Sequence, residues 1–145
     1  MPRLLALQAL AALLIMLAAC TPTPTALTGT AWTLEALHGQ PLINSSTISL
    51  AFGERSDERL GGFSGCNNYG ARYQATDTAF RVIGGVETTD MACVTPAGVM
   101  EQEQEYAETL MDVSTYRLTA GRLNMADERG DTVLVLRMQE GEQVP

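Results

Sequence analysis

The sequence contains no lysine, one histidine and one tryptophan, and its nine basic residues are all arginine. It has 17 acidic residues, so the formal net charge at pH 7 is −8. A chain this acidic is repelled by polyphosphate, which excludes nucleic acid as a partner. A single histidine cannot supply an all-histidine metal site, so we expect no metal and no cofactor. At 145 residues, the chain is long enough for one ordinary domain and too short for two.

The N-terminus indicates export. Arg3 precedes an almost wholly apolar run, residues 4–17, which is shorter than the about 20 residues of a membrane-spanning helix. The run ends in Leu-Ala-Ala before Cys20, which resembles the lipoprotein box of bacteria. That resemblance implies that a signal peptide, residues 1–19, is removed and that Cys20 is lipidated, anchoring the protein stably in a membrane. Thr21, not Asp, follows the cysteine, and in a Gram-negative organism that pattern implies transfer to the outer membrane. The alternative is an ordinary secretory signal with an incidental cysteine.

The remaining chain divides into a short tether, a domain and a tail. Two prolines within residues 21–25 forbid a helix, so residues 20–28 are expected to be the lipidated cysteine and an extended tether. The domain is expected over residues 29–137, and residues 138–145 form a C-terminal tail. About 110 residues are enough for one modest core.

Apolar residues recur with a period of two through most of this domain, which indicates strands. Such runs include residues 32–36, 48–52, 80–82, 116–118 and 123–125, and a last run over 132–138 is apolar enough for burial on both faces. Turn signals separate them, which favours a barrel or a sandwich.

One segment has helical spacing instead. Residues 97–112 are expected to form an amphipathic helix against the sheet, with Thr95 as its cap and Pro96 in its first turn. The apolar positions are Val99, Tyr106, Leu110 and Val113, and the acidic positions Glu101, Glu103, Glu105 and Glu108 are expected to form a solvated face.

Two blocks containing cysteine resemble those of a known family. Residues 65–73 are similar to the Gly-Cys-Asn-x-x-x-Gly-x-Tyr block of the META domain family (HslJ-type heat-inducible bacterial lipoproteins), with the second glycine one place early. Residues 89–93 match its Thr-x-Met-Ala-Cys block, and Glu103, Tyr106 and Leu110 are similar to the helix that follows. The motif residues are Gly65, Cys66, Asn67, Tyr73, Thr89, Met91, Ala92 and Cys93. The resemblance implies a mainly β, small barrel-like mixed β domain with one amphipathic α-helix packed on it. It also implies a link to stress tolerance or drug resistance at the envelope, without catalytic activity.

Cys66 and Cys93 remain once Cys20 is lipidated. An exported protein meets an oxidising compartment, so a Cys66–Cys93 disulfide is expected. The 27-residue separation corresponds to about 3.5 kcal/mol of loop entropy. Two buried free thiols, or one redox-active thiol, are the alternatives.

Several single residues have structural interpretations. Asn67 is expected to hold the turn at the first of these cysteines through backbone hydrogen bonds, and residues 61–65 to form a glycine-permitted bulge or bend. Trp32 and Met91 are expected to pack in the interior, and His38 to face solvent.

These observations predict a non-enzymatic, monomeric lipoprotein of the cell envelope. Its domain would face the periplasm and act by contact with an unidentified envelope protein or component, anchored to the membrane through Cys20. The alternatives are a β-barrel that binds a small ligand and an inhibitor of a periplasmic hydrolase that uses a loop such as residues 53–65.

Overall fold

The computed structural model describes residues 26–54 and 58–139. The expected signal peptide and Cys20 lie outside them, as do parts of the expected tether and tail. The elements are β1 (Ala31–Leu37), β2 (Gln40–Pro41), β3 (Ser49–Phe52), β4 (Arg59–Phe63), β5 (Asn68–Ala75), β6 (Phe80–Thr88), α2 (Val99–Asp112), β7 (Thr115–Thr119), β8 (Arg122–Ala126) and β9 (Thr132–Met138). In this part of the chain, no helix has the length and hydropathy needed to cross a membrane.

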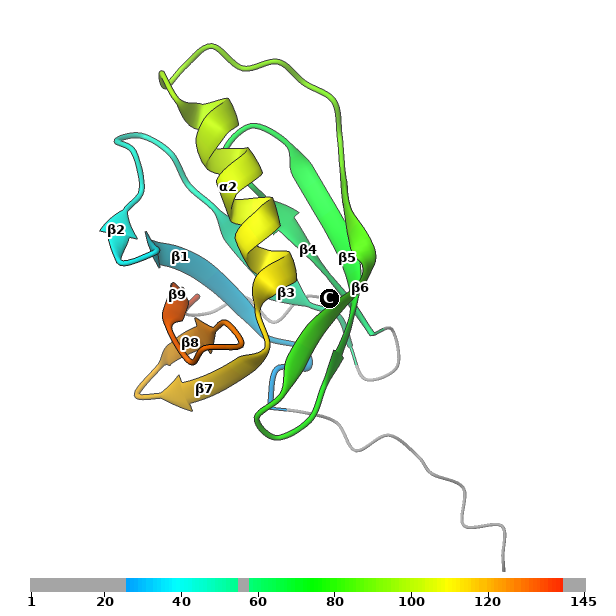
Figure 1. The fold of residues 1–145 in the computed structure, drawn as a ribbon. Coiled ribbons are helices and arrows are strands. Elements are labelled where there is room, and N and C mark those ends of the chain that lie inside the picture. Colours follow the sequence, from blue (N-terminus) through cyan, green and yellow to red (C-terminus); the bar gives the residue numbers. More distant parts are fainter. Residues whose placement is uncertain (1–25, 55–57, 140–145) are drawn as a thin grey trace, which may run out of the picture.

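The strands form one antiparallel sheet that curls into a half-barrel (Figure 1). The order is β6-β5-β4-β3-β1-β9-β8-β7, and the short β2 extends β1 as a hairpin. Strands β3 to β6 form one meander and β7 to β9 a second. Strand β1 lies between them and pairs with β3 and β9. The mainly β, barrel-like class with one packed helix is therefore confirmed.

The two edge strands meet only at one end of the curl. An isolated bridge joins Ala79 to Thr115, and the Phe80 amide donates to the Ser114 carbonyl at 2.9 Å. Beyond this corner β6 and β7 diverge, and α2 packs against β6 and β9 across the opening. The helix thus completes a wall that the sheet leaves open.

Side chains fill the interior of the described domain. Phe52 packs edge-on against Tyr73 and Phe80, at centroid distances of 5.1 and 6.2 Å. The largest fully buried side chains are Trp32, Tyr106, Phe52, Leu27, Ile48, Leu50, Leu110, Leu123, Met125, Leu134, Leu136 and Val99. The core position expected for Trp32 is confirmed. A packed interior does not favour the alternative of a ligand held inside the barrel.

The helix begins later than its sequence predicts. Gly98 precedes its first residue and has a left-handed φ of 86°, which ends any helical path from Thr95. The expected Thr95 cap and Pro96 first turn are therefore wrong. Pro96 lies in a turn closed by a bond from the Val99 amide to its carbonyl.

Residues 59–63 form strand β4, so the loop predicted over residues 53–65 is shorter than expected and the first two glycines of the glycine-rich stretch lie in a strand. A Cβ built on Gly62 would lie 2.1 Å from the Ser49 carbonyl oxygen, and one on Gly61 would lie 2.7 Å from that of Tyr69. Neither distance is possible for a side chain. The two glycines therefore let neighbouring backbones approach closely where the sheet curls.

Candidate functional site

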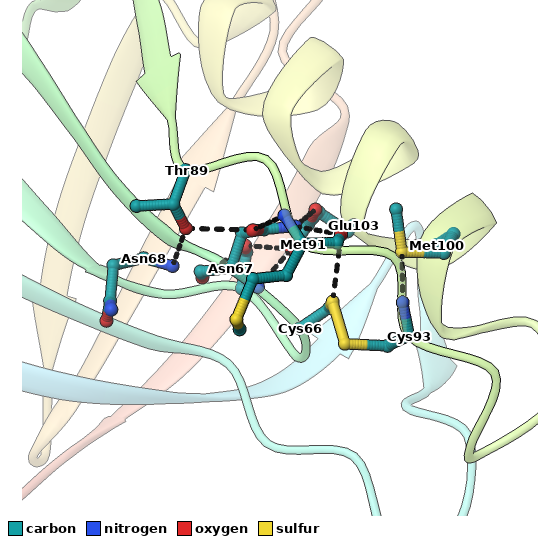
Figure 2. The surroundings of a disulfide bond; sticks show 9 residues. Cys66, Asn67, Asn68, Thr89, Met91, Cys93, Met100 and Glu103 are labelled. Atoms are coloured by element: carbon teal, nitrogen blue, oxygen red, sulfur yellow. Dashed lines mark hydrogen bonds between the residues drawn. A yellow bond between two sulfur atoms is a disulfide. The ribbon is translucent and has the colours of Figure 1, made fainter.

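The expected disulfide is present and joins two turns that follow different strands. Cys66 lies in the turn between β4 and β5, and Cys93 lies in the segment that connects β6 to α2. The two Cα atoms are 5.9 Å apart. The Cys93 amide also points at the Met100 sulfur of the helix, at 3.4 Å (Figure 2). The pairing predicted from an oxidising compartment is confirmed.

Asn67 connects the same two turns through hydrogen bonds. Its Oδ1 accepts from the Thr89 hydroxyl and the Met91 amide, both at 2.8 Å. Its Nδ2 donates to the Met91 carbonyl at 3.1 Å and to Glu103 Oε1 at 2.7 Å. The backbone carbonyl of Asn67 accepts from the Ser64 amide at 2.8 Å. The role predicted for Asn67 in holding the turn is confirmed, and it extends to a second turn and a helix. We call these five residues the asparagine cluster.

Glu103 is the acidic member of the asparagine cluster, and the residue is 7% exposed. Its Oε2 accepts from the Asn67 amide at 2.7 Å and from the Ser64 hydroxyl. Burial alone would raise the pKa of Glu103. The hydrogen bonds from Ser64 and Asn67 outweigh burial and lower that pKa below its ordinary value. The solvated position expected for Glu103 is therefore wrong.

The sequence does contain a signal for Glu103. It lies four residues after Val99 and three before Tyr106, on the helical stripe whose apolar members were expected to pack on the sheet. Gln102, on the same side, donates to the Ser46 hydroxyl at 2.7 Å and accepts from the Ile43 amide at 2.8 Å. Both polar side chains attach the helix to loops of the sheet.

A pair of buried tyrosines supports the helix one turn further on. The hydroxyls of Tyr69 and Tyr106 are 2.6 Å apart, and Tyr69 donates to the Ser49 carbonyl at 2.8 Å. Since Tyr69 has one proton, Tyr106 is the donor within the pair. Burial raises the pKa of both phenols, so each stays protonated and able to donate.

The other predicted motif residues have three different positions. Gly65 has a φ of 106°, and a Cβ there would lie 3.0 Å from the Ser46 hydroxyl, so only glycine suits the turn. Tyr73 packs in the core beside Phe80 and away from the disulfide. Met91 uses its backbone in the asparagine cluster, whereas its side chain is 52% exposed. The packing role expected for Met91 is therefore wrong.

The site connects the β4–β5 turn, the segment after β6 and the helix through hydrogen bonds and a disulfide. Asn67 uses its side-chain amide, its backbone amide and its backbone carbonyl for internal hydrogen bonds, and both oxygens of Glu103 accept from neighbours. In the described ranges, 26–54 and 58–139, no three His, Cys, Asp or Glu residues are grouped so that they could hold a metal ion. His38 is exposed as expected, and its Nε2 lies 2.8 Å from the Thr109 hydroxyl.

Comparison with known proteins agrees with the fold and with the family that the sequence resembles. The family model described as the META domain matches residues 25–140. The chain belongs to the META domain family. Among curated proteins, no sequence matches this META domain protein.

Solved structures share the architecture of this META domain. An NMR structure of a protein from Burkholderia xenovorans is 26% identical, with a TM-score of 0.61 over 79% of this chain and 85% of that one. A second NMR structure is 22% identical, with a TM-score of 0.59 over 77% and 91% of the two chains. A crystal structure of a DUF4847 family protein from Bacteroides vulgatus is 15% identical, with a TM-score of 0.53 over 81% and 97%. The last two similarities concern the fold alone.

Proposed function

We propose that this META domain protein is a lipid-anchored component of the cell envelope that works by contact and not by catalysis. The observation that carries the proposal is that the asparagine cluster uses its polar groups internally. The polar groups of Asn67 and Glu103 bond to each other, to the hydroxyls of Thr89 and Ser64 and to nearby backbone. A catalytic acid, base or nucleophile needs a group left free for substrate. The motif is better suited to fixing the shape of a surface.

Anchoring is the second part of the proposal. The apolar run, residues 4–17, and the Leu-Ala-Ala sequence before Cys20 support processing at this cysteine and lipid attachment. Several acyl chains would hold the domain at one membrane face, in the outer membrane if the cell has one. Concentrated there, a small binding domain meets envelope partners at a high effective concentration.

The experiment uses a strain that lacks the protein and is challenged with heat or with an envelope-directed drug. The wild-type protein should restore survival and should be recovered with membranes, with an N-terminal mass that includes lipid on Cys20. The Cys20→Ser variant should lose both the lipid and the rescue, whereas the adjacent Thr21→Ser variant should keep both. Rescue by Cys20→Ser at wild-type level would overturn the role of the anchor.

Catalysis has its own test. A reaction catalysed by the purified protein and lost in the Cys66→Ser or Glu103→Gln variant, with the fold retained, would contradict the contact function.

A further inference from the structure

We infer that residues 91–97, here called the tip loop, form the surface through which this protein binds a partner protein. The partner is expected to present an apolar cleft with basic side chains at its rim. This inference rests on the contact function proposed above and specifies its surface and the chemistry of its partner.

The tip loop exposes large apolar side chains to solvent, which does not stabilise an isolated monomer. Val94 is 86% exposed, the highest value among the large exposed hydrophobic residues of the described chain, and Met91 is 52% exposed. Residues 91–97 contain no charged side chain. Phe63, 37% exposed, ends β4 near the turn that holds Cys66. Exposed apolar residues that gather at one place mark interaction surfaces more often than single scattered ones do.

The tip loop is also held in a fixed conformation. The disulfide fastens Cys93 to the β4–β5 turn, and Asn67 bonds both the amide and the carbonyl of Met91 (Figure 2). These contacts use the backbone of Met91 and leave its side chain, and that of Val94, directed outward. A loop ordered before binding loses less conformational entropy in a complex, so its contacts contribute more of their energy to affinity. The motif residues would thus serve to hold the tip loop in its binding conformation.

The position of the tip loop favours a partner away from the anchoring membrane. Ala26, the first described residue, lines a groove with Asp77 and Thr78 of the β5–β6 turn. Cys66 and the tip loop lie beyond the other end of β5, whose eight residues span about 25 Å (Figure 1). A chain tethered through residues before Ala26 would therefore point the tip loop away from its own membrane.

The surrounding charge specifies the partner further. Between Arg81 and Arg117 the chain has seven acidic residues and no basic one. Exposed members of this set, Asp90 and Glu101, flank the tip loop in sequence. A neighbouring groove of about 390 Å³ lies between β6 and α2, and its lining includes the acidic Glu101 and Glu103 beside the apolar Val86 and Met100. An apolar surface with an acidic border suits a cleft with a basic border, and it repels anionic lipid and another copy of itself.

The test places a photo-crosslinking amino acid at Val94 in the full-length protein, in cells of the native host. The matched control carries it at Leu118, an exposed apolar residue that lines the groove near Ala26. We expect a protein adduct from position 94 and none from position 118. The captured protein is then purified and titrated with the wild-type, Val94→Asp and Leu118→Asp proteins. Val94→Asp should weaken binding by about tenfold or more, and Leu118→Asp should leave it nearly unchanged.

The outcomes separate a failure of the tip loop as binding surface from a failure of the proposed contact function. An adduct from position 118 alone, or wild-type affinity in Val94→Asp, would overturn the tip loop as the surface and leave the contact function standing. Adducts at position 94 with lipid, or with a second copy of this chain, would overturn the partner class. No protein adduct from either position, with or without stress, would count against both. Val94→Asp and Leu118→Asp must melt like the wild type, which their exposure predicts.

Discussion

At the residue scale, the side chain of Asn67 makes four hydrogen bonds, which connect the β4–β5 turn to the tip loop, to Thr89 and to the helix. Replacing it by alanine removes four side-chain hydrogen bonds and leaves the Met91 amide and the Glu103 carboxylate with fewer buried partners. We expect Asn67→Ala to lower the free energy of unfolding by about 3 kcal/mol, measured by urea denaturation. The exposed neighbour is the control: Asn68→Ala should cost less than about 0.5 kcal/mol. Equal effects would show that the asparagine cluster contributes little stability.

Glu103 gives the same cluster a pH dependence. Its pKa is lowered in the folded protein, so its contribution to stability is complete above the ordinary value of 4.5 and is lost as the pH falls through the folded value. We expect the stability of the wild type to fall more steeply on acidification below pH 4.5 than that of Glu103→Gln. Glu101→Gln, which changes an exposed carboxylate, should keep the wild-type slope. Unfolding followed by Trp32 fluorescence over a pH series measures this difference, and parallel curves for all three proteins would contradict it.

At the scale of elements, the curl of the sheet depends on glycines that the neighbouring strands approach closely. Gly62→Ala would place its Cβ 2.1 Å from the Ser49 carbonyl oxygen, so β3 and β4 would have to separate. We expect this variant to lose about 2 kcal/mol or more of stability in thermal or urea denaturation. Gly70→Ala is the matched control in the adjacent strand, because its nearest contact would be 3.7 Å away and its φ is ordinary. A wild-type midpoint for Gly62→Ala would mean that the backbones are not so close.

The sequence predicts the elements unevenly, and the reasons are physical. Strands β1, β3, β7 and β8 alternate clearly between apolar and polar residues, whereas β9 is a nearly continuous apolar run, and all five were expected. The start of β6, residues 80–82, was expected as well. Strand β5 alternates too, through Tyr69, Ala71 and Tyr73, but these positions were interpreted as part of a block containing a cysteine. The glycines of β4 resemble loop composition, because glycine permits both a turn and a close approach. Amino-acid propensity therefore cannot distinguish a glycine in a turn from a glycine in a closely packed strand.

The sequence also predicts only part of the candidate site. The two cysteines and Asn67 lie in recognisable blocks, whereas Ser64 and Glu103, which also belong to the asparagine cluster, are residue types that are usually exposed. A glutamate is rarely buried without partners, so its burial depends on Asn67 and Ser64 being in place. These partners come from a distant part of the sequence and meet Glu103 only in the folded structure. The position of Glu103 on the buried stripe of the helix is compatible with burial, but the local sequence does not show that Asn67 and Ser64 lie beside it.

At the scale of the whole molecule, the half-barrel should have a gradient of stability from its centre to its edges. Strand β1 is paired on both sides and its Trp32 is fully buried, whereas β6 and β7 are edges that touch only near Ala79 and Thr115. We therefore expect the amides of β1, including the Leu34 amide bonded to Ile48, to exchange with deuterium at rates set by global unfolding.

The same gradient predicts fast exchange at the open edge. About half the amides of an edge strand point away from its only partner strand. The amides of β6 that point away from β5, beyond the Ala79–Thr115 corner, should therefore exchange much faster than the amides of β1. Residue-resolved hydrogen exchange by NMR measures both sets, and uniform protection across the sheet would contradict the gradient. The amide of Met91 is the exception to watch. It lies outside any strand, yet its bond to Asn67 should protect it more than the amides of β6, because the asparagine cluster fixes the tip loop independently of the sheet edge.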